Sequence, residues 1–451
     1  MNTTEVLQLL RAHEVRNVTC IAPDGSWPVV WTRARGVHVW DAEGRRYVDL
    51  TAAFGVAATG HANPRVVRAA QRQLTRLLHA MGDVHPHPLK AQLARELSRI
   101  TFERWTERPR ESASGENQPL LTGKTLFCNS GFEAVEAALK TAVLATGKPG
   151  VIAFEGAYHG LGYGALSVTH REFFRRPFRA QLGRFAHFLP FPEAAPDRDH
   201  DGWLERLADA ARRILRRAKI GAVLVEPIQG RGGIRMPPPE FLPWLRRFCD
   251  EHGALLIVDE IYTGFGRTGR WFACEHTGVV PDVICLGKAL AGGFPISACV
   301  GRADVMDAAW PESRGEALHT STFAGHPVGC AMAMAQLSEI ERLKLPERAA
   351  LVGTWLLERL GALRAPRTGL RLSARGMGLM VGLEVRRRDG APAGEEAFRI
   401  VKAMLRRGYI LLTEGEHGNV LSFTPPLTIS KPQLRGAIAA LQNLFGGPIP
   451  G

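Results

Sequence analysis

A run of five apolar residues that ends in a carboxylate decides the fold: Ala254-Leu255-Leu256-Ile257-Val258-Asp259. A second apolar run, Val283-Ile284-Cys285-Leu286, precedes Gly287-Lys288. Short, continuous apolar runs of this kind are typical of strands buried on both faces of a parallel sheet. Asp259 and Lys288 are therefore expected at the carboxyl ends of two strands, the edge at which open α/β sheets bind ligands.

Asp259 and Lys288 are the two protein groups that pyridoxal phosphate chemistry requires. A lysine amine forms a Schiff base with the aldehyde of this cofactor, and a carboxylate keeps the pyridine nitrogen protonated so that the ring accepts electrons. Taken singly, the two residues are more simply explained as a loop-capping aspartate and a surface lysine, because isolated motif matches are weak. The residues around them favour the functional interpretation.

Further motifs stand in order along the chain. They are Tyr47-Val48-Asp49-Leu50 with Gly60-His61, then Asp259–Gly269, then Pro281-Asp282 with Gly287–Gly293, and finally Pro425-Pro426-Leu427-Thr428. Together they resemble the class III aminotransferases, a fold-type I family of pyridoxal phosphate enzymes, and the resemblance covers almost the whole chain. It implies a transaminase that moves an amino group from an amine or amino acid donor to a 2-oxo acid by a ping-pong mechanism.

The alternation of strand and helix patterns predicts an α/β fold with a doubly wound, mostly parallel sheet. Strands are expected at Thr125–Cys128, Val151–Phe154, Ala222–Val225, Leu255–Val258 and Val283–Leu286, and later at Leu379–Val385 and Val420–Phe423. Helices are expected at Pro64–Leu78, Trp203–Arg217 and Glu240–His252, and a β-hairpin over Gly36–Asp49. The resemblance implies a large cofactor-binding domain, 64–325, and a smaller α+β domain built from 1–63 and 326–451.

The first of these strands leads through Asn129-Ser130-Gly131-Phe132 into a helical pattern. Unpaired backbone N–H groups and the helix dipole favour an anion at such an N-terminus. An ordinary helix cap is the alternative explanation. The resemblance makes Ser130, Gly131 and Phe132 the cup for the cofactor phosphate, with Phe132 in place of the family's alanine.

The resemblance also implies how the cofactor ring is held. Tyr158 would stack on one face of the ring, and Ile261 would cover the opposite face. His159 is either a structural histidine or the residue that places Asp259. Glu226, at a predicted strand end, matches a family glutamate near the cofactor, although a salt-bridged strand end would explain it equally.

Two further cofactor residues follow from the resemblance. Tyr262 stands where relatives have a glutamine, so its contact with the ring hydroxyl departs from the family pattern. Thr322, in the segment His319–Pro327, matches a threonine that reaches the phosphate of the neighbouring subunit. This match implies at least a homodimer, because one chain would not complete a site.

The substrate side departs from the family pattern. Ornithine-type and 4-aminobutyrate-type relatives pair a glutamate after Glu-Pro-Ile-Gln-Gly with an arginine before the Pro-Pro-Leu turn. Here Arg231 and Ser422 occupy those two positions, and Phe54 stands where ornithine-type enzymes have tyrosine. We therefore expect a different specificity. Arg231 either binds a substrate carboxylate through its two-pronged guanidinium or is a surface residue beside a glycine turn.

A pair of histidines lies in Asp83-Val84-His85-Pro86-His87-Pro88. An extended X-Pro segment would place both rings on one side, but two histidines make an incomplete metal site, so no metal is predicted. The segment lies near the pocket in relatives, and His85 is a candidate to line it.

Composition agrees with a large cytoplasmic enzyme. The 451 residues can bury a sizeable core. We expect no membrane span and no signal peptide, because neither pattern is present. Seven cysteines without a Cys-x-x-Cys pair indicate reduced thiols. The net charge of +13 comes mainly from scattered arginines without interleaved aromatics, so nucleic-acid binding is not predicted.

The main alternative keeps the cofactor and changes the reaction, because some relatives are amino-acid racemases or epimerases. Racemisation needs a second proton carrier on the ring face away from Lys288, and Arg231 is a poor one because it stays protonated near neutral pH. A catalytically silent binding protein is disfavoured because Lys288, Asp259 and the phosphate cup are all present. We therefore predict amino-group transfer.

Overall fold

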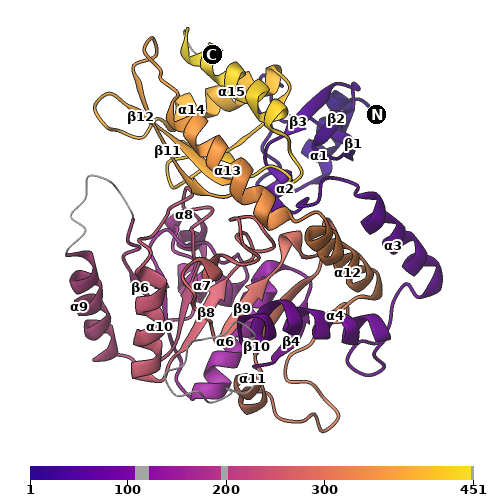
Figure 1. Ribbon diagram of the computed structural model, residues 1–451, viewed down its shortest axis with the longest axis vertical. Coiled ribbons are helices and arrows are strands. Elements are labelled where there is room, and N and C mark those ends of the chain that lie inside the picture. The colour runs from indigo at the N-terminus through magenta and orange to yellow at the C-terminus, as the bar shows by residue number, and fades with distance from the viewer. Residues whose placement is uncertain (107–120, 194–201, 448–451) are drawn as a thin grey trace.

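The computed structural model describes residues 1–106, 121–193 and 202–447 (Figure 1). Its central sheet has seven strands in the order β4-β10-β9-β8-β7-β5-β6. Strands β5 to β9 are paired parallel, and β10 runs antiparallel to both of its neighbours. The strands are β4 (Gly123–Cys128), β5 (Gly150–Phe154), β6 (Ala186–Leu189), β7 (Ile220–Val225), β8 (Leu255–Asp259), β9 (Val283–Leu286) and β10 (Ser297–Arg302).

The predicted α/β class with a mostly parallel sheet is confirmed, and each of the five strands expected for it is present. Two strands were missed. Strand β10 contains Ser297, Ala298 and Gly301, residue types that carry little intrinsic strand signal, and it forms because it is hydrogen-bonded between β4 and β9. Strand β6 is a short strand at the sheet edge.

Helices cover both faces of this sheet, as its buried residues show. Ile257 and Cys285 pack with helix α6 (Gly131–Thr146) in one apolar cluster. Their strand neighbours Leu256 and Ile284 pack with α10 (Phe241–His252) in another. Because successive side chains of a strand point to opposite faces, these continuous apolar runs are buried on both sides.

The remaining helices around the central seven-stranded sheet connect its strands or flank it (Figure 1). They are α3 (Pro64–Arg76), α4 (Pro88–Ser98), η1 (Arg99–Glu103), α5 (Arg104–Thr106), α7 (Tyr163–Val168), α8 (Glu172–Arg175), η2 (Arg176–Gln181), α9 (Trp203–Leu215), η3 (Ala273–His276), η4 (Lys288–Leu290), α11 (Ala303–Ala309) and α12 (Pro327–Arg342). Helices α3 and α9 end two residues before their predicted ends, within the usual uncertainty of helix boundaries.

The N-terminal segment and the C-terminal segment meet in one sheet. Strands β1 (Trp31–Arg35), β2 (His38–Asp41) and β3 (Arg46–Asp49) are joined by β13 (Tyr409–Ile410), which pairs parallel to β3. The expected hairpin is β2 with β3. Figure 1 shows the indigo N-terminal strands beside the yellow C-terminal helices. The exact boundaries at 63/64 and 325/326 stay predictions.

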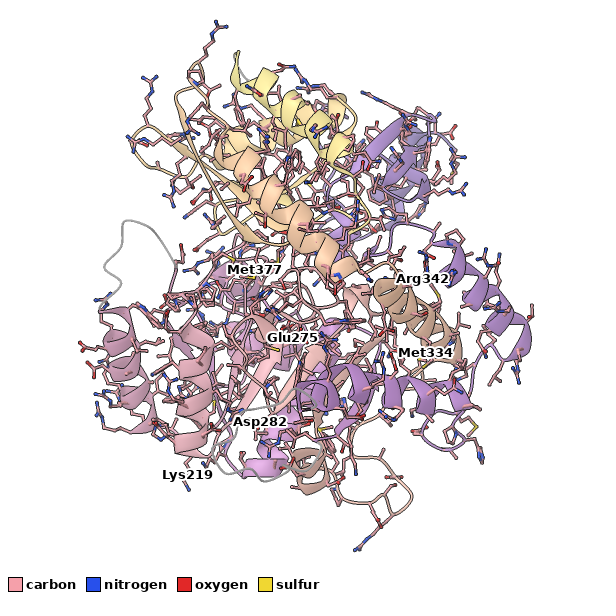
Figure 2. The ribbon with its side chains drawn as sticks, viewed as in Figure 1. Lys219, Glu275, Asp282, Met334, Arg342 and Met377 are labelled. Atoms are coloured by element: carbon pink, nitrogen blue, oxygen red, sulfur yellow. The ribbon has the colours of Figure 1, made fainter. Side chains whose placement is uncertain are left out.

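A second small sheet belongs to the C-terminal segment. Its antiparallel order is β11-β12-β15-β14, with β11 (Leu370–Met377), β12 (Met380–Arg387), β14 (Leu412–Glu414) and β15 (Val420–Phe423). Helices α13 (Leu345–Gly361), α14 (Gly394–Arg406) and α15 (Lys431–Phe445) pack around it. Figure 2 shows Met377 where this part meets the central sheet, in an apolar cluster with Ile228, Ile234 and Met380.

Two short elements complete the N-terminal segment, α1 (Thr3–His13) and the turn α2 (Ala52–Gly55). The backbone of α2 is left-handed, with φ of 48° at Ala52, 48° at Ala53 and 63° at Phe54. Asp49 holds this strained turn by accepting hydrogen bonds from the N–H groups of Thr51 at 2.8 Å and Ala53 at 3.0 Å. In the described part of the chain, no helix combines the length and apolarity that a membrane span requires.

Candidate active site

A cavity of about 410 Å³ opens beyond the carboxyl ends of β5, β7, β8 and β9. This is the edge at which the sequence predicted a ligand site. Most of the predicted site residues line it: Gly131, Phe132, Tyr158, His159, Glu226, Arg231, Asp259, Ile261, Tyr262 and Lys288. The cavity therefore brings together residues from widely separated parts of the chain.

Lys288 begins the short helix η4 directly after β9, with φ at +40°. A left-handed backbone is strained for any residue other than glycine, and such strain gathers at functional sites. Burial lowers the pKa of the Lys288 amine, and the nearby carboxylates of Asp259 and Glu226 oppose that shift. A lowered pKa increases the share of neutral amine, which is the nucleophilic form toward a carbonyl carbon.

Asp259 is buried at the end of β8 and is held from two sides. His159 Nδ1 lies 2.8 Å from Asp259 Oδ2, and the N–H of Ile261 donates to Oδ1 at 3.1 Å. Of the two explanations for His159, the geometry therefore matches the one in which it places Asp259. His159 Nε2 is buried and has no hydrogen-bond partner among the described residues.

The segment Ser130–Phe132 lies at the N-terminus of the 16-residue helix α6. The Glu133 carboxylate accepts from the N–H groups of Asn129 at 2.6 Å and Ser130 at 2.9 Å, and so closes the turn. A Cβ atom on Gly131 would lie 3.0 Å from the Ile261 side chain, tighter than most real contacts. Ser130 Oγ is buried without a hydrogen-bond partner among the described residues.

These groups fit pyridoxal phosphate. The unpaired Ser130 hydroxyl and the α6 N-terminus are donors suited to a phosphate. The buried Lys288 amine suits the aldehyde, and the Asp259 carboxylate suits a protonated ring nitrogen. Tyr158 and Ile261 stand in the cavity wall, as two residues that enclose a flat ring would.

Glu226 follows β7 and its carboxylate is buried beside the same cavity. It accepts hydrogen bonds from the N–H groups of Tyr158 at 2.9 Å and Gly230 at 3.0 Å. Burial raises the pKa of Glu226 to about 7, with His159 opposing and Asp259 adding to the shift. Glu226 therefore binds backbone N–H groups. The salt-bridge alternative would require an arginine or lysine partner, and Glu226 has none among the described residues.

Arg231 stands in the cavity wall with 35% of its side chain exposed, and its Nε lies 3.5 Å from Glu414 Oε2. Its Cζ is 5.4 Å from the centroid of the Tyr158 ring. The Glu414 side chain is only 3% exposed, and burial raises its pKa against the pull of Arg231. The N–H of Gly415 donates to the Arg231 carbonyl at 3.1 Å and joins the two segments.

Sequence reasoning missed Glu414. It lies on β14, which pairs with the strand that carries Ser422, and the hydrogen bond from Gly415 to the Arg231 carbonyl brings it beside Arg231. One signal was available, since an arginine in place of the family's glutamate calls for a compensating carboxylate. Several acidic residues would have met that condition, so the sequence alone did not identify this one.

Five predicted residues do not line the cavity of this single chain. Ser130 lies directly beside it, before the lining residue Gly131. Phe54 is 53% exposed on the left-handed turn α2. Thr322 and His85 are exposed, on the segments before α12 and α4. Ser422 is buried within β15, opposite Leu412. Their proposed roles stay predictions.

The two neighbouring histidines are in different environments. His87 is buried, with Nε2 2.7 Å from the Gly325 carbonyl, and its Nδ1 caps helix α4. His85 is exposed. The expectation that both rings lie on one side is therefore wrong, because the helix cap turns His87 inward. Within the described residues, no group of three or more His, Cys, Asp or Glu side chains is placed to hold a metal ion.

Comparisons with known proteins agree with this geometry. Residues 21–445 match the family model described as aminotransferase class-III. The acetylornithine aminotransferase of Methanosarcina mazei is 35% identical over 419 residues, which is 93% of this chain and 92% of that one. The 5-aminovalerate aminotransferase of Pseudomonas aeruginosa is 38% identical over 424 residues, 93% of both chains.

Solved structures show the same fold. The (S)-enantioselective omega-transaminase of Thermomicrobium roseum has a TM-score of 0.86 at 28% identity, over 99% of this chain and 98% of that one. An amine transaminase from an uncultivated Pseudomonas species, solved with pyridoxal phosphate, has a TM-score of 0.83 at 30% identity, over 96% and 98%. The chain therefore belongs to the class III aminotransferases, a family of pyridoxal phosphate-dependent transaminases.

Proposed function

We propose that this aminotransferase takes its amino group from a donor with a terminal primary amine and passes it to an acidic 2-oxo acid. The carboxylate of the acceptor would pair with Arg231. Both half-reactions would use the same cavity, in a ping-pong order. The alternative of racemisation gains no support, because the relatives described above are named aminotransferases.

The position of Arg231 carries the acceptor proposal. Its guanidinium is held against the Tyr158 ring and beside Glu414, and its buried Nε has no hydrogen-bond partner among the described residues. A substrate carboxylate would supply the hydrogen-bond acceptors that Arg231 lacks, and guanidinium–carboxylate pairs are strong and directional. Glu414 would serve as the counter-ion of Arg231 when no acidic substrate is bound.

The donor proposal rests on relatives. Three of them are named for acetylornithine, 5-aminovalerate and putrescine. Each of these compounds carries a primary amine at the end of an unbranched carbon chain. The putrescine aminotransferase of Pectobacterium atrosepticum is 37% identical over 436 residues, 94% of this chain and 85% of that one. A donor of this shape would enter the cavity with its amine toward Lys288.

The residues of this chain would share the chemistry as follows. When bound, pyridoxal phosphate supplies the carbonyl carbon that carries the amino group and the ring that withdraws electrons from the substrate. The Lys288 amine would take the proton that leaves the substrate carbon and deliver it to the cofactor carbon that receives the amino group, as general base and then acid. Asp259, placed by His159, keeps a proton on the ring nitrogen. Ser130 with the backbone of Gly131 and Phe132 binds the phosphate.

The assembly is proposed to be a homodimer in which Thr322 reaches the phosphate site of the partner. Thr322 lies in an exposed loop beside exposed apolar side chains on two neighbouring segments, Leu78, Met81, Val84, Leu318 and Phe323. Burying such a patch favours association. The seven cysteines are all free thiols, which supports a reducing, cytoplasmic location.

The decisive experiment follows the visible absorption of the cofactor-loaded protein. Putrescine, 5-aminovalerate and N-acetylornithine are added singly without any oxo acid, and bleaching of the band identifies the donor. 2-Oxoglutarate and pyruvate are then added, and we expect 2-oxoglutarate to restore the band at lower concentration. L-Alanine is added in a separate sample; a band that persists there while the alanine loses its optical purity would instead establish racemisation. Lys288→Ala serves as the control for the band itself.

A further inference from the structure

The face of the Tyr262 ring lies against the Lys288 amine. Lys288 Nζ is 4.7 Å from the centroid of that ring. Tyr262 follows β8 by three residues, and its ring lies in the cavity wall. The Lys288 amine therefore faces an aromatic ring as well as charged groups.

Two glycines leave the space that the Tyr262 ring occupies. A Cβ atom on Gly55 would lie 2.7 Å from Tyr262 Cε2, and one on Gly230 would lie 2.3 Å from Cδ1. Both distances are shorter than real contacts, so a side chain at either position would displace the ring. Gly55 belongs to the left-handed turn α2 and Gly230 to the segment after β7. Backbone from two distant segments thus encloses the ring on two sides.

The phenol oxygen anchors the far end of the same ring. Tyr262 Oη is 3.1 Å from Thr424 Oγ1, which in turn donates to the Thr51 carbonyl at 3.3 Å. The hydroxyl of Tyr262 therefore donates to Thr424. A ring fixed at its edges by Gly55 and Gly230 and at its tip by Thr424 has little freedom to rotate away from Lys288.

Burial and the surrounding charged groups have opposing effects on the Lys288 ammonium, and the Tyr262 ring adds a further attraction. The amine faces three carboxylates, Asp259, Glu226 and Glu414, and one cation, Arg231. Burial works against the ammonium form and lowers its pKa overall. An aromatic face attracts a cation through its negative quadrupole, and the attraction grows when water is excluded. Tyr262 thus supplies attraction to the ammonium without adding a charge.

We propose that the Tyr262 ring is a cation-binding platform that positions the Lys288 amine and stabilises its protonated form. A lysine that takes up a proton during transamination is an ammonium for part of the cycle, and the platform would hold it in place at that stage. This use in catalysis rests on the proposed role of Lys288, whereas the contact between ring and amine does not.

Graded fluorination of the ring tests the platform without changing its size. Tyr262→Phe retains the aromatic face, and one, two or three fluorine atoms on that phenylalanine weaken its quadrupole in steps. The readout is the rate at which trinitrobenzenesulfonate labels Lys288 in the cofactor-free protein, quantified by peptide mass spectrometry. Only the neutral amine reacts, so the rate at neutral pH reports the protonation of Lys288.

We expect Tyr262→Phe to be labelled at close to the wild-type rate. Labelling should then rise with each added fluorine, to about tenfold for the trifluorinated ring, the equivalent of one unit in pKa. The same series at Tyr409, on β13 of the N-terminal sheet, should leave labelling unchanged. Thermal unfolding of each variant confirms that it is folded.

Equal labelling rates across the Tyr262 series would overturn the platform, as would an equal rise in the Tyr409 series. Failure of the proposed function is recognised separately. In that case none of the three terminal amines bleaches the visible band of the loaded wild-type protein, while the labelling experiment still reports on the contact between Tyr262 and Lys288.

Discussion

The two sides of the cavity are built differently. The cofactor side is built on the central sheet. Asp259 ends β8, Lys288 follows β9, and the Ser130–Phe132 turn joins β4 to helix α6. On the substrate side, Arg231 comes from a loop and Glu414 from the small C-terminal sheet, and the exposed Phe54 belongs to a left-handed turn near the N-terminus. The residues proposed for the chemistry thus stand on one rigid element, and those proposed for specificity stand on segments that only the folded chain brings together.

The difference teaches where variation is tolerated. A displaced strand end would misplace a reacting group, and small misplacements are costly in catalysis. Loops and edge strands carried by a rigid scaffold are free to change the substrate without changing the reaction. The pairing of Arg231 with Glu414, which come from different segments, fits this division.

Replacing Lys288 with Ala should have the largest effect. We expect loss of at least about 10⁴-fold in the rate of either half-reaction, because the group that moves the proton is removed. The rate is measured as formation of the carbonyl product from the best donor in a single turnover of each loaded protein. Phosphate binding should survive, since Ser130 and the α6 N-terminus are unchanged. Near-normal rates in this variant would show that the cofactor side is assigned wrongly.

Asp259→Asn should come second, with a loss of about 10²-fold to 10³-fold. An amide does not keep the ring nitrogen protonated, so electron withdrawal by the ring weakens. His159→Gln, which removes only the group that places Asp259, is the matched comparison and should lose less. If His159→Gln proved the more harmful, His159 and not Asp259 would be the principal group at the ring.

Glu226 should make the stability of the cofactor-free protein depend on pH. Because burial raises its pKa from 4.5 to about 7, the folded protein binds this proton more tightly than the unfolded chain does. The stabilisation is complete below pH 4.5 and is lost as the pH rises to 7. Between pH 5 and pH 8 the loss is roughly 2 to 3 kcal/mol.

Urea unfolding of wild type and Glu226→Gln at both pH values measures this contribution. The variant should lose less stability than the wild type over the same interval, because its side chain does not titrate. Parallel pH profiles for the two proteins would place the Glu226 pKa near its ordinary value.

Substrate-side changes should be smaller and selective. Arg231→Ala should raise KM for an acidic oxo acid about tenfold, close to the 1.5 kcal/mol of a weak charged hydrogen bond, and leave KM for an uncharged amine unchanged. Steady-state kinetics with each substrate varied in turn provides both values. Equal effects on the two substrates would exclude a specific carboxylate contact.

Glu414→Gln should have the smallest effect and the opposite sign. Removing the internal counter-ion frees Arg231, so KM for the acidic acceptor should fall by a few fold. Glu416→Gln, an exposed carboxylate on the same segment, is the control and should change little. A rise in KM for Glu414→Gln would show that Glu414 positions Arg231 and does not compete for it.

The sequence by itself determined the α/β class and its buried parallel strands. It also placed Asp259, Lys288 and the Ser130–Phe132 turn, because each directly follows a local pattern whose geometry is known. Strand β10, whose residues carry little strand signal, was invisible until its two neighbours were in place. The inward orientation of His87 was equally hidden in the sequence, because it depends on a contact with the distant Gly325 carbonyl.

Only the tertiary structure decided the pairing of Arg231 with Glu414 and the contact of Tyr262 with Lys288. Glycines at positions 55 and 230 and threonine at 424 have no local reason to act on one ring. Gly55 and Thr424 lie 207 and 162 positions from Tyr262 along the chain, and no periodicity records such contacts. Strand ends are encoded locally, whereas the surroundings of a buried charge are set by every segment that packs against it.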